Sequence, residues 1–147
     1  MRPKGINVLL LEDNPHDVER FVRVMKEHAH VAVASDGAEA LDRVFRRGRF
    51  ATEPLPDIVV IDLNVPLLNG HEVINVLKSN SHTRHIIVIV WTASENPDDI
   101  QKALSLGACG YMVKKTDIDD YDFRLKAFSD FWLQAVEYMP ELSWREK

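Results

Sequence analysis

Four short apolar runs in the sequence each end in side chains that could bind a metal ion or a phosphoryl group. Glu12 and Asp13 follow the first of these runs, and Asp62 follows the run VVI; Thr92 and Lys114 end the other two. A carboxylate at the end of a buried strand loses hydration, so its charge needs compensation. The residue types therefore raise the question of which partner compensates Asp62.

A hard divalent cation is the partner that these residue types favour. Three neighbouring carboxylates repel one another unless a cation joins them. No Cys or His stands at these run ends, and oxygen ligands suit Mg²⁺ better than Zn²⁺. We therefore expect Mg²⁺, with Mn²⁺ as a substitute, close to Asp62. Asp62 would then be a nucleophile for a phosphoryl group, and the ammonium of Lys114 and the hydroxyl of Thr92 would stabilise the transferring oxygens.

The elements that must position these residues alternate along the chain. Short runs rich in Val, Ile and Leu predict strands, and patterns with apolar residues at helical spacing separate them. The predicted strands are 6–11, 31–34, 58–61, 86–91 and 111–113. Helix starts are indicated by Asn14-Pro15, by Asp36 with Glu39 three residues later, and by Asn96-Pro97. We expect a loop over 48–56.

This alternation predicts an α/β fold with a five-stranded parallel sheet, doubly wound as (βα)5, because parallel strands need crossover helices. The carboxyl ends of parallel strands share one edge of the sheet, and ligands bind there at the switch point of strand order. The candidate site residues should therefore meet in one crevice. We expect residues 1–147 to form one domain, with an extended last helix over about 118–139 and a short tail.

Composition narrows the class of protein. The 147 residues carry 18 Lys and Arg against 23 Asp and Glu, a net charge of −5, which disfavours nucleic-acid binding. Cys109 is the only cysteine, so an internal disulfide is impossible, and we expect it to be buried packing. No apolar run approaches the roughly 20 residues of a membrane span, and no signal peptide is indicated. These features predict a cytoplasmic protein without membrane or nucleic-acid partners.

The sequence resembles the receiver domain of two-component response regulators, which has a flavodoxin-like fold. The matching segments are LLLEDN (9–14), VVIDLNVPLLNG (59–70), VIVWTAS (88–94) and GYMVKK (110–115), and the likeness covers about residues 5–135. It implies that Asp62 is the phospho-acceptor, that Glu12 and Asp13 hold Mg²⁺, and that Asn64 offers its backbone carbonyl to the metal. The remaining implied roles are a phosphoryl-binding and switch set of Thr92, Lys114 and Tyr111.

One position departs from the family pattern. The family commonly has proline after the lysine, often with a cis peptide, whereas Lys115 follows Lys114 here. A cis bond before a non-proline residue costs about 2.5–4 kcal/mol. The sequence leaves open whether this peptide is trans and whether Lys115 is a plain surface charge.

The chain also resembles a narrower group, the stand-alone regulators encoded with phytochrome-type histidine kinases. The features are the 48–56 loop, the phrase TASENPDDIQKALSLGA (92–108) and the FWL segment (131–133). The resemblance implies that the phosphoryl donor is a sensor histidine kinase of the light-sensing type.

The last helix carries two apolar stripes where one would suffice to cover the sheet. The first consists of Tyr121, Leu125, Phe128, Trp132, Val136 and Met139, and the second of Phe123, Ala127, Phe131 and Tyr138. We expect a homodimer through this helix, with help from the fourth helix and the fifth strand, and with Phe123, Phe131, Trp132 and Tyr138 at the interface. In the alternative, residues 140–147 fold back over the second stripe.

Several functions fit the same site chemistry. The leading prediction is a non-enzymatic switch that accepts a phosphoryl group and signals through protein contacts, or a carrier in a phosphorelay. A Mg²⁺-dependent aspartyl phosphatase commonly has an acidic residue two positions after its nucleophile, and Asn64 cannot perform that proton transfer. A non-phosphorylated scaffold of the same fold would usually lack part of the site, and none of it is missing here.

Overall fold

Short runs of branched apolar residues form five parallel strands, the arrangement predicted from the sequence. The computed structural model describes residues 5–115 and 117–137, and its sheet has the order β2-β1-β3-β4-β5. From β1 the chain continues to β2 on one side, and from β3 it continues to β4 and β5 on the other side. The switch point of this sheet therefore lies between β1 and β3. The strands are β1 (Asn7–Leu11), β2 (His30–Ala34), β3 (Ile58–Ile61), β4 (Ile87–Thr92) and β5 (Gly110–Val113).

Helices follow the strands and begin at the caps that the sequence indicates. The side chains of Asn14, Asp36 and Asn96 each accept hydrogen bonds from backbone N–H groups of the first helical turn. The helices are α1 (Pro15–Met25), α2 (Gly37–Val44), α3 (Gly70–Ser79), α4 (Pro97–Leu106) and α5 (Ile118–Phe128). Asn69 and Asp117 cap α3 and α5 in the same way, although no cap was predicted there.

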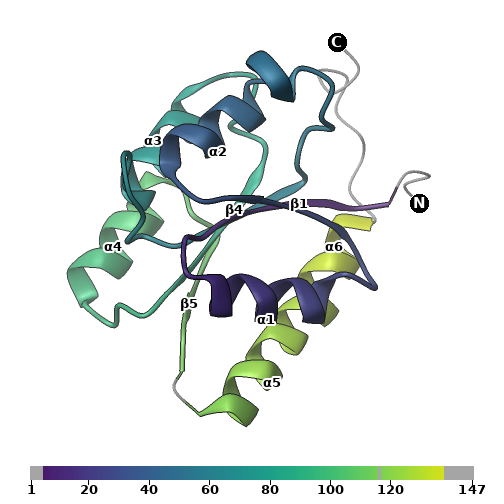
Figure 1. Ribbon diagram of the computed structural model, residues 1–147. Helices are drawn as coiled ribbons and strands as arrows, with labels where there is room; N and C mark the ends of the chain where they lie inside the picture. Colours follow the sequence, from purple (N-terminus) through teal and green to yellow (C-terminus); the bar gives the residue numbers. More distant parts are fainter. Residues whose placement is uncertain (1–4, 116, 138–147) are drawn as a thin grey trace.

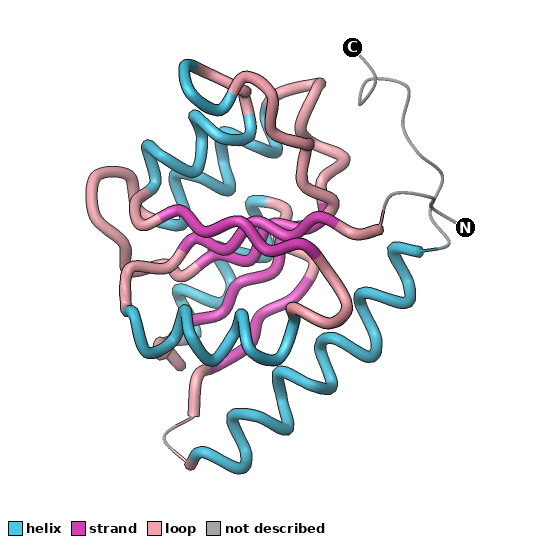
Figure 2. The backbone as a smooth tube through the Cα atoms, turned by 45° about the vertical axis from the view of Figure 1, so that its right-hand side comes forward, coloured by secondary structure: helices cyan, strands magenta, loops and turns pink. Residues whose placement is uncertain are grey.

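The helices form two layers around the sheet (Figure 1). Helices α1 and α5 cover one face, and α2, α3 and α4 cover the other; Figure 2 shows the strands as the layer between them. Alternate residues of each strand point to opposite faces, so Leu10 joins the core under α1 and α5 while Leu9 and Leu11 join the core under α2 and α3. Both faces of the sheet are therefore buried, as its continuous apolar strands require.

Two local predictions differ from the structure. The 48–56 segment contains a short 3₁₀ turn, η1 (Gly48–Phe50), because Phe50 is buried there beneath the guanidinium of Arg43, 4.4 Å from the ring centroid. Cys109 was expected to be buried and is exposed. Its neighbour Ala108 fills the core position, so the side chain of Cys109 points outward.

The last helix is not one regular α-helix. Helix α5 passes into a π-helical turn, η2 (Ser129–Leu133), and then into α6 (Gln134–Glu137). The π turn adds one residue per turn, so the buried stripe steps by five from Phe128 to Leu133. Leu133 thus takes the core position that the sequence pattern gave to Trp132. The predicted end of this helix, 138–139, lies outside the described residues, as does the tail at 140–147.

None of the helices in the described part of the chain is long and apolar enough to cross a membrane.

Candidate functional site

Asp62 lies at the carboxyl end of β3 and both oxygens of its carboxylate are engaged. The hydroxyl of Thr92, at the end of β4, donates to Oδ1 over 3.0 Å. The ammonium of Lys114, just after β5, donates to Oδ2 over 3.0 Å. Both Asp62 and Thr92 are buried. The structure thus brings together three of the predicted site residues from three neighbouring strands.

The predicted acidic cluster is present beside Asp62. Carboxylate oxygens of Glu12, Asp13 and Asp62 lie within 4.8 Å of one another; Glu12 and Asp62 are buried and Asp13 is exposed. Burial raises the pKa of the Glu12 carboxyl to about 7, and the charge of Asp62 contributes to the rise while Lys114 opposes it. Three oxygen donors with mutual repulsion and one side open to solvent fit a hard divalent cation.

Lys114 is the positive centre of the site. Its Nζ lies 2.5 Å from Oε1 of Glu12 and 2.8 Å from Oδ2 of Asp17, in addition to the bond to Asp62. Burial lowers the pKa of this ammonium, but its carboxylate partners Asp17 and Glu12 outweigh burial and raise the pKa above its usual range. The backbone N–H of Lys114 also donates to the carbonyl of Thr92 over 2.7 Å, which fixes the end of β5 against β4.

Asp17 is a site residue that the sequence interpretation missed. It stands in the first turn of α1, where an acidic residue is ordinarily explained by the helix dipole. Its carboxylate instead binds Lys114 through one oxygen and the hydroxyl of Tyr121 through the other. The signal available in the sequence was the position of Asp17, three residues after the cap Asn14 and close to Glu12.

Asn64 lies in the loop between β3 and α3. Its backbone N–H donates to Oδ1 of Asp62 over 3.1 Å, and its side chain is exposed. The loop is closed by the N–H of Gly70, which donates to the carbonyl of Leu63 over 3.1 Å. The role that the resemblance implies for the backbone carbonyl of Asn64 stays a prediction.

Tyr111 on β5 is half-buried, and its hydroxyl donates to the carbonyl of Ser94 over 3.0 Å. Burial raises the pKa of this phenol. The hydroxyl of Ser94 in turn binds Oδ2 of Asp99 over 2.6 Å, at the first turn of α4. Tyr111 thus ties β5 to the segment that follows Thr92, and its predicted switch role stays a prediction.

The peptide between Lys114 and Lys115 is trans, since no cis bond is present in the described residues. Nζ of Lys115 forms a surface ion pair over 3.0 Å with Oε1 of Glu95, which lies on the loop after β4. Such an exposed pair contributes about 0–1 kcal/mol. The departure from the family pattern therefore leaves the position of Lys114 intact.

The members of the second apolar stripe that the structure describes, Phe123, Ala127 and Phe131, are exposed. Phe123 is 71% exposed and Phe131 58%, whereas Trp132 is half-buried and packs edge-on against Phe131. These side chains border an open groove of about 490 Å³ that Tyr111 and Met112 of β5 also line. Tyr138, the fourth predicted interface residue, lies outside the described residues.

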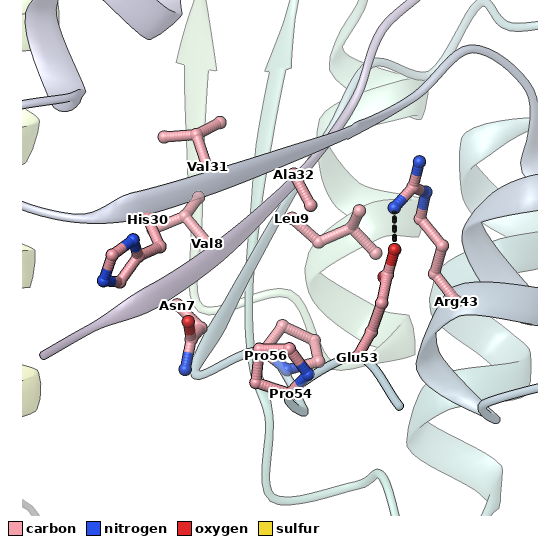
Figure 3. A pocket seen from close by; sticks show the side chains of 10 residues that line it. All are labelled: Asn7, Val8, Leu9, His30, Val31, Ala32, Arg43, Glu53, Pro54 and Pro56. Carbon is pink, nitrogen blue, oxygen red and sulfur yellow. Dashed lines mark hydrogen bonds and ion pairs between the residues drawn. The ribbon is translucent and has the colours of Figure 1, made fainter. Parts of the chain in front are cut away.

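A second cavity, of about 220 Å³, lies at the opposite edge of the sheet. Figure 3 shows its lining by Val8 and Leu9 of β1, His30 of β2 and two prolines before β3. An ion pair between Arg43 and Glu53 closes one side over 2.5 Å. Its walls are mainly apolar, and it is lined by the amino-terminal parts of the strands, so it takes no part in the chemistry around Asp62.

The fold and the acidic site around Asp62 are those of a receiver domain. The response regulator receiver domain family matches residues 8–126, which is most of the chain. This chain belongs to that family, and it has the five-stranded flavodoxin-like fold of response-regulator structures. A role as phosphoryl acceptor fits the family, and a sensor kinase is the partner that membership implies.

The similar proteins include response regulators of nearly the same length as this chain. Response regulator Rcp1 from Synechocystis sp. is 29% identical over 132 residues, 88% of this chain and 90% of that protein. The Mn²⁺-bound form of Rcp1 superposes with a TM-score of 0.87 at 28% identity, over 92% of this chain and 99% of that one.

Two further solved structures that resemble this chain are regulators of light signalling. The phosphorylated cyanobacterial phytochrome response regulator RcpA gives a TM-score of 0.85 at 28% identity, covering 89% of this chain and 96% of that one. RPA3017, a regulator in red light signaling of R. palustris, gives 0.82 at 33% identity, covering 93% and 99%. The chain is thus a receiver-domain response regulator related to the phytochrome response regulators.

Proposed function

We propose that Asp62 accepts a phosphoryl group from a sensor histidine kinase, with Mg²⁺ as the metal. One observation carries this assignment: the two oxygens of Asp62 are held by Thr92 and Lys114 beside an acidic cluster open to solvent through Asp13. A nucleophilic carboxylate in that setting is already oriented and already faces the positive charge that the transferring oxygens need.

In the proposed transfer, an oxygen of Asp62 forms a bond to phosphorus while the phosphorus–nitrogen bond of a phosphohistidine breaks, and the leaving imidazole keeps the electron pair. Lys114 neutralises charge on the phosphoryl oxygens, and the hydroxyl of Thr92 donates to one of them instead of to Asp62. Glu12, Asp13, Asp62 and the backbone carbonyl of Asn64 are the groups that would hold the cation. When bound, the cation supplies positive charge at the transferring oxygens.

The test is the intact mass of the protein after incubation with acetyl phosphate and Mg²⁺. The native chain should gain one phosphate and Asp62→Ala none. Asp57→Ala is a weak control because Asp57 is buried, so Asp120→Ala, at the surface, is the matched control and should gain phosphate like the native chain. A phosphate on Asp62→Ala would refute the assignment.

A switch is favoured over a phosphatase. The side chain of Asn64 is an amide without a titratable proton, and it is exposed two residues after Asp62. Release of the phosphoryl group is then the end of a signal and not turnover of a substrate. A carrier role in a phosphorelay uses the same site, and transfer from the phosphorylated chain to a second histidine-containing protein would identify it.

A phytochrome-type kinase is the donor that we propose. Support comes from the phytochrome regulator RcpA and the red-light regulator RPA3017, both of which resemble this chain along almost its whole length. Phosphotransfer from a light-sensing histidine kinase should be faster than from a histidine kinase of another sensor class at equal concentration. Equal rates would leave the receiver function in place and remove the light-sensing assignment.

We also propose a homodimer through the α5–η2 face. Phe123, Ala127 and Phe131 expose apolar surface on one side of the helix, and Trp132 extends it toward β5. The double variant Phe123→Glu/Phe131→Glu should have the molar mass of a monomer in light scattering. Val76→Glu on α3, an apolar site outside the face that is 37% exposed, should keep the mass of the native chain.

A further inference from the structure

The side chain of Tyr121 connects helix α5 to the phosphoryl-accepting site. Tyr121 is 4% exposed, and its hydroxyl donates to Oδ1 of Asp17 over 2.7 Å. The other oxygen of Asp17 accepts from Nζ of Lys114 over 2.8 Å. One carboxylate of α1 therefore joins α5 to the end of β5.

The donors of Lys114 are fully used in this arrangement. An ammonium has three N–H groups, and the carboxylates of Glu12, Asp17 and Asp62 provide three acceptors. Because the side chain of Lys114 is only 11% exposed, water is a poor replacement for a lost partner. Removing Asp17 would leave a donor unpaired and allow the ammonium to move.

Tyr121 also contacts Lys114 indirectly, through the ring of Trp91. Nζ of Lys114 lies 5.0 Å from the ring centroid of Trp91, and Tyr121 packs edge-on against Trp91 with centroids 5.4 Å apart. The guanidinium of Arg20 lies over the Tyr121 ring, 4.7 Å from its centroid. The phenol, the indole and the ammonium thus pack as one unit.

We propose that Asp17 and Tyr121 are positioning residues for Lys114 and that they transmit its position to helix α5. This inference rests on Asp62 as the phospho-acceptor. A phosphoryl group on Asp62 replaces the single charge of this carboxylate with a doubly charged set of oxygens, so the ammonium of Lys114 moves toward it and its bonds to the other two carboxylates weaken. Asp17 is the partner that loses least, since its side chain is 19% exposed and Glu12 is fully buried.

The movement of Lys114 away from Asp17 changes the contacts of α5. When Lys114 leaves Asp17, the negative charge of Asp17 is left to Tyr121, and the first turns of α5 respond. Phe123, two residues along the same helix, belongs to the exposed apolar face. Phosphorylation therefore reaches that face without passing through Thr92 and Tyr111.

The chain offers a matched pair of variants for the test. Tyr121→Phe and Tyr111→Phe each remove one phenolic hydroxyl, and only Tyr121 binds Asp17. Hydrogen exchange of the α5 backbone amides should change on phosphorylation in the native chain and in Tyr111→Phe, and should not change in Tyr121→Phe. A residue with a purely structural role would alter α5 exchange equally in both phosphorylation states. The same response in Tyr121→Phe as in the native chain overturns the transmission.

The positioning of Lys114 has its own readouts. The maximal phosphorylation rate at saturating acetyl phosphate should fall about tenfold in Asp17→Ala, the factor for one lost charge-assisted hydrogen bond. The Mg²⁺ affinity should stay within about twofold of native, since Asp17 is outside the acidic cluster. Asp120→Ala, an exposed pair with Arg124, should keep the native rate. A native rate in Asp17→Ala overturns the positioning.

A readout without phosphate separates this inference from the assignment of Asp62. The ¹⁵N signal of the Lys114 ammonium should be sharp in the native chain, and it should broaden in Asp17→Ala and Tyr121→Phe because the ammonium exchanges more freely. One outcome is a broadened Lys114 signal in these variants together with no phosphate gain by the native chain. It would refute Asp62 as the phospho-acceptor and the transmission to α5, and it would uphold the positioning of Lys114 by Asp17 and Tyr121. Phosphate gain with an unchanged Lys114 signal would overturn the inference alone.

Discussion

The hydroxyl of Thr92 donates to Oδ1 of Asp62 over 3.0 Å, and both side chains are buried. The bond spans the ends of β3 and β4, so it ties the carboxylate to the strand that leads into the Ser94 segment held by Tyr111. A group added to Asp62 competes for the same hydroxyl. The bond is therefore one point at which a change on Asp62 would be passed to β4.

Replacing Thr92 by Val should disconnect Asp62 from Tyr111. Val keeps the shape of Thr and removes the donor, so phosphorylation should no longer shift the NMR signals of Ser94 and Tyr111. The cost in stability should be about 1 kcal/mol, measured by urea unfolding. Thr92→Ser keeps the donor and should retain the shifts; a phosphorylation response of native size in Thr92→Val would contradict this view.

Lys114→Met should destabilise the metal-free protein by about 3–5 kcal/mol, because it leaves buried negative charge on Glu12 and Asp62 without a partner. Urea unfolding with a chelator present measures the loss. Added Mg²⁺ should restore part of it, since a cation in the cluster meets the same charges. Lys115→Met removes an exposed ion pair and should change stability by less than about 1 kcal/mol. Equal stability of the two variants would show that Lys114 is not the compensating charge.

Asp13→Asn should separate metal binding from folding. Removing one of three repelling carboxylates should leave the metal-free chain as stable as native or slightly more so. With free Mg²⁺ at ten times the native Kd, the native chain gains about 1.4 kcal/mol and the variant should gain far less. Thermal unfolding with and without Mg²⁺ gives both values. A full gain in the variant would exclude Asp13 as a ligand.

Gly70→Ala should strain the loop that carries Asp62. A Cβ at position 70 would lie 2.7 Å from Cα of Leu63 and 2.8 Å from the carbonyl oxygen of Asp62, both backbone atoms that cannot yield easily. We expect a loss of about 1–3 kcal/mol in urea unfolding. Gly48→Asn is the control, because position 48 has a φ of +55° that Asn tolerates and open space around it. A loss no larger than in the control would mean that the loop adapts.

The sequence predicted the sheet and the main site because both depend on local pattern. Apolar runs define the strands, their ends bring Asp62, Thr92 and Lys114 together, and topology alone makes those ends adjacent. No strand bound differs from the predicted one by more than one residue, and such differences arise because hydrogen bonding and side-chain pattern do not stop at the same residue.

What the pattern could not show were contacts set by side-chain reach and by one extra helical residue. Asp17 and Tyr121 are far apart in the sequence, and Tyr121 had been assigned only by its apolar ring. The π turn at 129–133 moved Leu133 into the core, because a step of five does not appear in a repeat of three and four. Both depend on how α1 and α5 pack.

The exposed thiol of Cys109 makes the native chain a ready substrate for single-site labelling. It is the only cysteine of the sequence, and it directly precedes β5, whose other end leads to Lys114. A maleimide-linked dye or spin label would attach there without any change of sequence. In two associated copies, the distance between the labels would report how the β5 edges are arranged, under the same conditions in which the phosphoryl group is added.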